Sequence, residues 1–154
     1  MATRRQKIMT LISGYLSNIT VANGYKTTVA SVHHWKAKAE PKANSTILNL
    51  KDELQEYTTE RREALHITIE VACKTSTNYT TITNLFQDIH KCLEDNLANI
   101  KSALSNCGTV YIENLEDAIV DISTETDAET IEGYVSIILT HRITEKTDVD
   151  ETSY

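Results

Sequence analysis

The side chains best suited to metal binding or nucleophilic chemistry are five histidines and three cysteines. His33 and His34 are adjacent, and adjacent side chains on a strand point to opposite faces, so the pair is not expected to ligate one metal ion. Cys73, Cys92 and Cys107 lie 19 and 15 residues apart, without the C-x-x-C spacing of zinc or redox sites. We therefore predict no metal site, and free thiols in a reducing compartment.

Acidic side chains gather in residues 113–132, where eight acids occur without a basic residue. Paired catalytic carboxylates require one buried member with a raised pKa, whereas this stretch has the composition of turns and strand ends. It also lacks the D-x-D-x-D-G spacing of a calcium loop. The sequence contains no G-x-S-x-G, no glycine-rich phosphate loop and no H-E-x-x-H. We therefore expect a solvated acidic surface, and we predict no catalytic residue and no cofactor.

Charge is distributed unevenly along the chain, whose net charge is −7. Residues 1–50 hold seven basic side chains and one acid, which gives +6, while residues 51–154 hold eight basic side chains and 21 acids, which gives −13. One interpretation is uneven scatter over a solvated surface. The other is two oppositely charged faces, which suit head-to-tail contact between copies. The basic start lacks an apolar segment and no run approaches 18 apolar residues, so we predict no signal peptide and no membrane span.

Hydrophobic periodicity predicts two helices and several strands. The helices are expected over residues 4–19 and 78–104, where apolar residues recur at helical spacing. The clearest strand pattern is the alternation from Leu65 to Cys73. The predicted strands are residues 26–35, 46–50, 64–74, 109–113, 117–122 and 131–143. Polar sequence separates them, as an exposed loop at 36–45, a charged hairpin arm at 51–63 and an acidic turn at 124–130.

These elements predict an α+β fold, in which a mainly antiparallel sheet of five or six strands has two helices packed on one face. We expect residues 1–144 to form a single domain. Residues 145–154 carry four acids and one aliphatic side chain, Val149, and are expected to form a flexible acidic C-terminal tail.

The candidate interaction residues fall into three groups. Tyrosine and arginine are enriched in interface hot spots, which favours the arm. Basic residues beside Trp35 also suit a single-stranded nucleic acid, although the chain as a whole is acidic. The candidates are Arg4, Arg5, Lys36, Lys38 and Lys42 in the basic part, Tyr57, Arg61 and Arg62 in the arm, and Glu125, Asp127 and Glu129 in the acidic turn.

A series of short motifs resembles the tail terminator, or tail completion, proteins of long-tailed bacteriophages in order and spacing. The resemblance covers about residues 4–143. Its most suggestive part is A-N-G-Y-K-T after a short amphipathic helix, and the polar stretch 42–45 departs from the pattern. The matching segments are Arg5-x-x-Ile8, Leu11–Ile19, Ala22–Thr27 leading to Val32, Leu65–Val71, Asp88–Leu93 and Tyr134–Ile143.

The resemblance implies a structural protein of the virion that is assembled in the host cytoplasm. Such proteins form a ring, usually a hexamer, on the tail tube protein, where they end tube growth and present a surface to head-neck connector proteins. DNA passes only through the lumen, and neither catalysis nor a cofactor is involved. The alternatives are another neck, head–tail connector or tail tube component, a nucleic-acid-binding α+β module, and a small enzyme.

Overall fold

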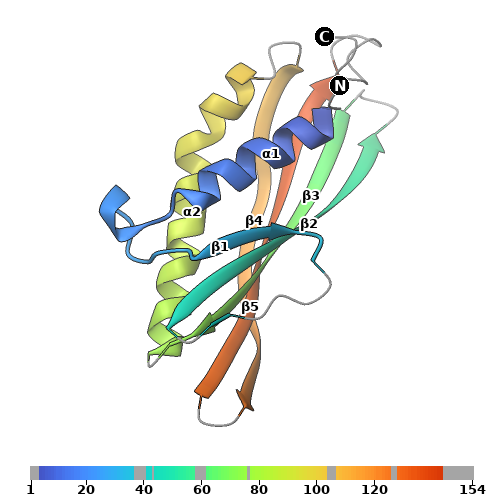
Figure 1. Ribbon diagram of the computed structural model, residues 1–154. Coiled ribbons are helices and arrows are strands. Elements are labelled where there is room, and N and C mark those ends of the chain that lie inside the picture. Colours follow the sequence, from blue (N-terminus) through green and yellow to red (C-terminus); the bar gives the residue numbers. More distant parts are fainter. Residues whose placement is uncertain are drawn as a thin grey trace.

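Two helices and a five-stranded sheet make up the fold (Figure 1). The computed structural model describes residues 4–36, 41–42, 44–57, 62–75, 77–103, 107–125 and 128–143. The elements are α1 (Arg4–Ser17), the 3-10 helix η1 (Val21–Asn23), β1 (Ser31–His34), β2 (Ser45–Tyr57), β3 (Arg62–Lys74), α2 (Asn78–Ala103), β4 (Cys107–Glu125) and β5 (Ala128–Ile143). The predicted α+β class is confirmed. Lys38, Arg61, Asp127 and the predicted tail, residues 145–154, lie outside the described residues.

The sheet has the strand order β1-β2-β3-β5-β4 and is mixed. The pairs β2–β3, β3–β5 and β4–β5 are antiparallel, as expected. The pair β1–β2 is parallel, with Ser31 opposite Ile47, because the chain returns to the same end of the sheet before β2 begins. As a result β1 and β4 are the two edge strands.

The core lies where side chains of alternate strand residues meet the apolar sides of the helices. On β3, the odd-numbered residues from Leu65 to Cys73 are buried, which is the alternation that the sequence predicted. α1 contributes side chains three or four residues apart, and α2 packs against α1 as well as the sheet. Buried residues of both helices and of β2, β3 and β5 form one cluster, which includes Ile8, Ile12, Leu16, Leu50, Ile67, Leu85, Ile89 and Ile137. Burying each such side chain contributes about 1.5–3 kcal/mol.

Two predicted boundaries around the charged arm were wrong. β2 does not end at Leu50 but continues to Tyr57, and β3 begins at Arg62 instead of at residue 64. The pairing of the two strands is unbroken up to Tyr57 opposite Arg62. β5 pairs with the same part of β3, as far as Arg142 opposite Arg62. Residues 51–57 therefore belong to the sheet and do not form a separate arm. Their backbone groups pair with β3, which is held in turn by β5 on its other side, and this pairing does not require apolar side chains.

The acidic stretch also differs from the prediction. Instead of two short strands and a long turn, β4 runs continuously from Cys107 to Glu125, and β5 already begins at Ala128. Register shifts interrupt its pairing with β5 between Cys107 and Val110, Ile112 and Asn114, and Ile119 and Asp121. Such bulges allow a polar edge strand to remain paired while it bends. The polar residues between the two predicted strands therefore do not interrupt β4.

The predicted strand at residues 26–35 is reduced to the four residues of β1. Asp88 of α2 binds the segment that precedes β1. Its carboxylate accepts hydrogen bonds from the backbone N–H groups of Lys26, at 3.1 Å, and of Thr27, at 2.8 Å. These donors are consequently turned toward α2 and are lost to the sheet. Asn23 and Gly24 end η1 in a turn, with Gly24 in the left-handed region at φ 92°.

Candidate interaction site

Asp52 is a buried carboxylate at the edge of the core. It follows Leu48 and Leu50 in the alternation of β2 and pairs with Ile67 of β3, so the backbone directs it to the apolar side of the sheet. Its relative exposure is 6%. A charged group in this position requires compensating donors.

Three side chains supply those donors, one from α1, one from β1 and one from the residue that follows β1. His34 Nε2 lies 2.9 Å and Trp35 Nε1 lies 2.7 Å from Asp52 Oδ1. Arg5 of α1 binds the other oxygen through Nε, and its Nη2 donates to the Asp52 backbone carbonyl at 3.0 Å. We call Arg5, His34, Trp35 and Asp52 the Asp52 cluster; it joins α1, β1 and β2 at one corner of the fold.

The cluster keeps Asp52 ionised. Burial disfavours the charged form and on its own raises the pKa of Asp52. The hydrogen bonds from His34, Arg5 and Trp35 outweigh burial, so that the pKa lies below its ordinary value. The carboxylate is therefore a fixed negative charge that holds the surrounding side chains, and it has no proton to donate near neutral pH.

Trp35 is the unusual member of this cluster. Its backbone adopts φ 56°, a left-handed conformation that is rare for a bulky residue and costs about 1–3 kcal/mol. Its backbone N–H donates to the Leu50 carbonyl at 2.9 Å, and its indole N–H is bound by Asp52. Nevertheless 57% of the residue is exposed. The indole is thus held in one orientation with more than half of its surface uncovered.

Lys36, the next residue, is fixed by a buried amide. Asn49 Oδ1 accepts the Lys36 backbone N–H at 3.1 Å, and Asn49 Nδ2 donates to the Lys36 carbonyl at 2.8 Å. The same amide group donates to Glu70 Oε1 at 3.1 Å. The backbone of Lys36 is therefore clamped to β2, while its side chain is exposed. His34, Trp35 and Lys36, which we call the Trp35 edge, form a preorganised aromatic and basic surface at the end of β1.

The sequence-predicted interaction residues do not form a single patch. Arg5 is engaged within the Asp52 cluster, and Arg4 begins α1. Lys42 is exposed before β2, where its carbonyl accepts from Ser45. The remaining described candidates, Tyr57, Arg62, Glu125 and Glu129, lie at strand ends.

Those strand ends are at opposite ends of the sheet. Tyr57 pairs with Arg62 where β2 and β3 meet, whereas Glu125 ends β4 beside the start of β5. Figure 1 shows the two hairpins pointing in opposite directions. One partner surface therefore cannot contact the arm and the acidic turn of the same copy together unless it spans the full length of the strands.

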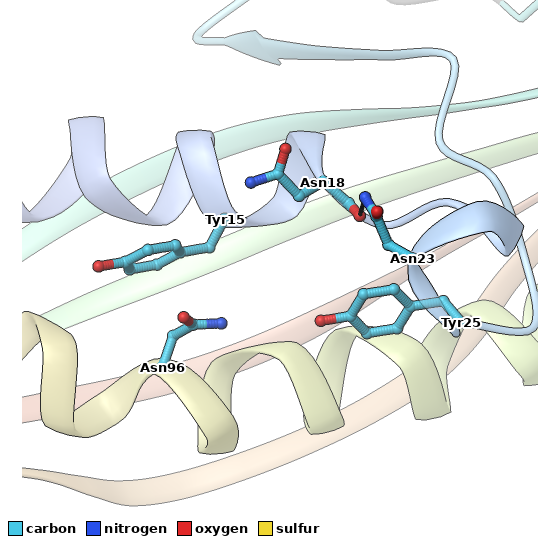
Figure 2. A pocket seen from close by; sticks show the side chains of 5 residues that line it. All are labelled: Tyr15, Asn18, Asn23, Tyr25 and Asn96. Atoms are coloured by element: carbon cyan, nitrogen blue, oxygen red, sulfur yellow. Dashed lines mark hydrogen bonds between the residues drawn. The ribbon is translucent and has the colours of Figure 1, made fainter.

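A polar pocket of about 450 Å³ opens between the end of α1, η1 and α2. Figure 2 shows Tyr15, Asn18, Asn23, Tyr25 and Asn96 around it. Asn23 Nδ2 donates to the Asn18 carbonyl at 2.9 Å, and Asn96 Nδ2 donates to the Cys92 carbonyl at 2.8 Å. The first bond joins η1 to the residue that follows α1, and the second lies within α2.

The described lining of this pocket consists of tyrosine and asparagine side chains. Burial, a hydrogen bond with Cys92 and the nearby charges of Asp95 and Asp88 raise the pKa of Tyr25 to about 12. Lys91 Nζ lies 5.2 Å from the centre of the Tyr25 ring, outside the lining itself. Tyr25 is therefore uncharged near neutral pH, and together with the amide groups it can bind uncharged polar groups.

The site contains two residues that the sequence analysis missed, Asp52 and Trp35. Asp52 was visible as an acid in the apolar phase of Leu48, Leu50 and Leu54, a position that requires donors if the strand continues. Trp35 was noted only for its basic neighbours; no sequence signal predicts its positive φ.

Within the described ranges, no helix is long and apolar enough to cross a membrane, and no group of three or more histidine, cysteine and acidic side chains is placed to hold a metal ion. No protein-family model and no curated protein matches the chain significantly.

Proposed function

We propose that this protein is a tail terminator of a long-tailed bacteriophage. In this proposal copies of the chain form a ring, a hexamer in most proteins that it resembles, at the head-proximal end of the tail tube. The ring ends tube polymerisation and offers a surface for head-neck joining. The protein acts in the virion without catalysis, and its partners are its own copies, the tube protein and the head-neck connector proteins.

The observation that carries the proposal is the Trp35 edge. Trp35 is 57% exposed, its indole is held by Asp52, and its backbone is strained. This conformation costs free energy that a plain solvated surface residue would not require. Rigid exposed aromatics are typical anchors of protein–protein interfaces, because little conformational entropy is lost when they bind. The Trp35 edge therefore supports a role in protein assembly, and the motif resemblance indicates that the assembly is the ring at the end of the tail tube.

Native mass measurement tests the proposal. The purified chain, or the chain bound to tail tubes, is expected to give one closed oligomer whose mass is a whole multiple of 17.3 kDa. Electron microscopy of the same sample is expected to show rings with a lumen. A chain that stays monomeric both alone and with tubes would contradict the proposal. Another tube or connector protein would instead bind along the tube or to the neck without arresting growth.

A second candidate function rests on the same residues. An exposed indole beside Lys36 is also a stacking platform for single-stranded nucleic acid. Such binding would weaken steeply with salt, since it releases counterions from phosphates. Tight, salt-dependent binding of an oligothymidylate to the monomer, abolished in Trp35→Ala, would favour this alternative over the ring.

A further inference from the structure

β4 forms the other edge of the described sheet and carries an acidic and partly apolar surface. Among the described strands β4 pairs only with β5, and its 19 residues contain five acids and no base. Glu116 and Asp117 are exposed there, and so are two large apolar residues, Ile119 at 37% and Val120 at 62%. Glu116, Asp117, Ile119 and Val120 are called the acidic edge here.

The local backbone explains why apolar side chains face outward on this strand. The register between β4 and β5 shifts between Ile119 and Asp121, which places Val120 at a bulge. Bulges also protect an edge from simple strand addition, so contact here is expected through side chains. Asp117 Oδ2 lies 3.2 Å from His90 Nε2 of α2, without the alignment of a hydrogen bond. Glu116 is exposed, and its Oε1 accepts one long hydrogen bond, from Asn114 Nδ2 at 3.4 Å.

We infer that the acidic edge of one copy binds the Trp35 edge of the next copy, with the indole against Ile119 and Val120 and Lys36 beside Glu116. The inference rests on the proposed function, whose ring it completes. Two different surfaces on opposite edges of one sheet form a heterologous contact, and repetition of such a contact closes a ring when the rotation between copies permits it. Opposite charge selects this pairing over contact between two like edges.

Association of the full-length chain measures both halves of the contact. Trp35→Ala is expected to weaken association between copies at least about 30-fold, the change that corresponds to an interface hot spot. Val120→Asp, which leaves the Asp52 cluster untouched, is expected to weaken it at least about tenfold. Tyr79→Ala is the matched control, because Tyr79 is an aromatic residue that is 69% exposed at the start of α2 and belongs to neither edge.

A charge exchange tests the register of the contact. Lys36→Glu and Glu116→Lys are each expected to weaken association roughly fivefold, and the double variant is expected to recover it, because each contact again joins opposite charges. Lys36→Glu with Glu94→Lys is the control pair, since Glu94 is an exposed acid of α2. Thermal unfolding verifies that each variant is folded.

The outcomes separate the inference from the function. Rings that form with unchanged affinity in Trp35→Ala and Val120→Asp, or a double charge exchange no better than either single change, would overturn the inference and leave the ring standing. Contact between these edges that yields open chains, or rings that do not arrest tube growth, would confirm the contact and overturn the proposed function. A wild-type chain that never associates would overturn both.

Discussion

Replacing Gly133 with alanine tests how closely α2, β4 and β5 pack. Gly133 of β5 lies opposite Val71 of β3 and Ile119 of β4. A Cβ atom there would lie 2.5 Å from the Ala118 carbonyl oxygen and 2.9 Å from Phe86 Cζ. The first distance is about 0.9 Å short of the 3.4 Å at which ordinary contact begins, and the obstacle is backbone. β4 would therefore have to move.

The expected cost follows from that displacement. Overpacking a well-filled core costs about 1–3 kcal/mol, and a clash with strand backbone belongs at the upper end. We expect Gly133→Ala to lower the free energy of unfolding by about 3 kcal/mol, and the Tm by about 6–12 °C for a domain of this size. Urea titration and thermal unfolding, both followed by circular dichroism, measure the two quantities.

Gly14→Ala is the matched control. Gly14 lies inside α1, is exposed, and has no neighbour within 4 Å of the position a Cβ would occupy. Alanine is favoured over glycine in a helix interior by about 0.8–1.0 kcal/mol, so this change is expected to raise the stability. If Gly133→Ala changed the stability by less than about 0.5 kcal/mol, the close approach of β4 and α2 to β5 would be refuted.

Three further predictions concern charge, thiols and the chain end. Asp52→Asn is expected to lower the free energy of unfolding by about 1–2 kcal/mol at pH 7. Because the folded pKa of Asp52 lies below its unfolded value, the stabilisation by the carboxylate is present above about pH 4 and disappears as the pH falls through the folded pKa. Equal urea midpoints of the variant and the wild type at pH 7 would contradict this expectation. Burial raises the pKa of Cys73 to about 12 and also raises the pKa of Cys92. In a Cys107→Ser variant, neither thiol is therefore expected to react with a disulfide reagent at pH 8 until urea is added. Rapid labelling of the folded protein would argue against the burial of these thiols. Truncation after Thr144 is expected to leave the Tm within about 2 °C of wild type, and a fall of many degrees would show that residues 145–154 contribute to packing.

The parts of the fold that the sequence predicted are those with a strong apolar period. The alternation from Leu65 to Cys73 and the helical spacing in α1 and α2 identified elements whose burial dominates their energy. The predictions failed where polar residues are paired rather than buried. Residues 51–57 were assigned to an arm, and residues 114–116 were left between two predicted strands, although backbone pairing keeps these residues in β2 and β4.

The candidate site was harder to predict, because it depends on contacts between distant segments. Arg5 and Asp52 are 47 residues apart in the chain, and Thr27 and Asp88 are 61 apart. Each pair places a buried carboxylate against donors from another element, which a periodicity argument does not detect. The parallel pairing of β1 with β2 was missed for the same reason, since register between strands joined by a long loop is set by tertiary packing.

Imaging tail tubes as they grow tests the central claim most directly. Purified tube protein, polymerised on its baseplate complex with and without this chain, would be sampled over time and the free ends examined by electron microscopy. The proposal predicts that the chain stops elongation and leaves a ring at the head-proximal end of every arrested tube. Tubes that elongate at the same rate to the same lengths, with no additional density at their ends, would contradict it.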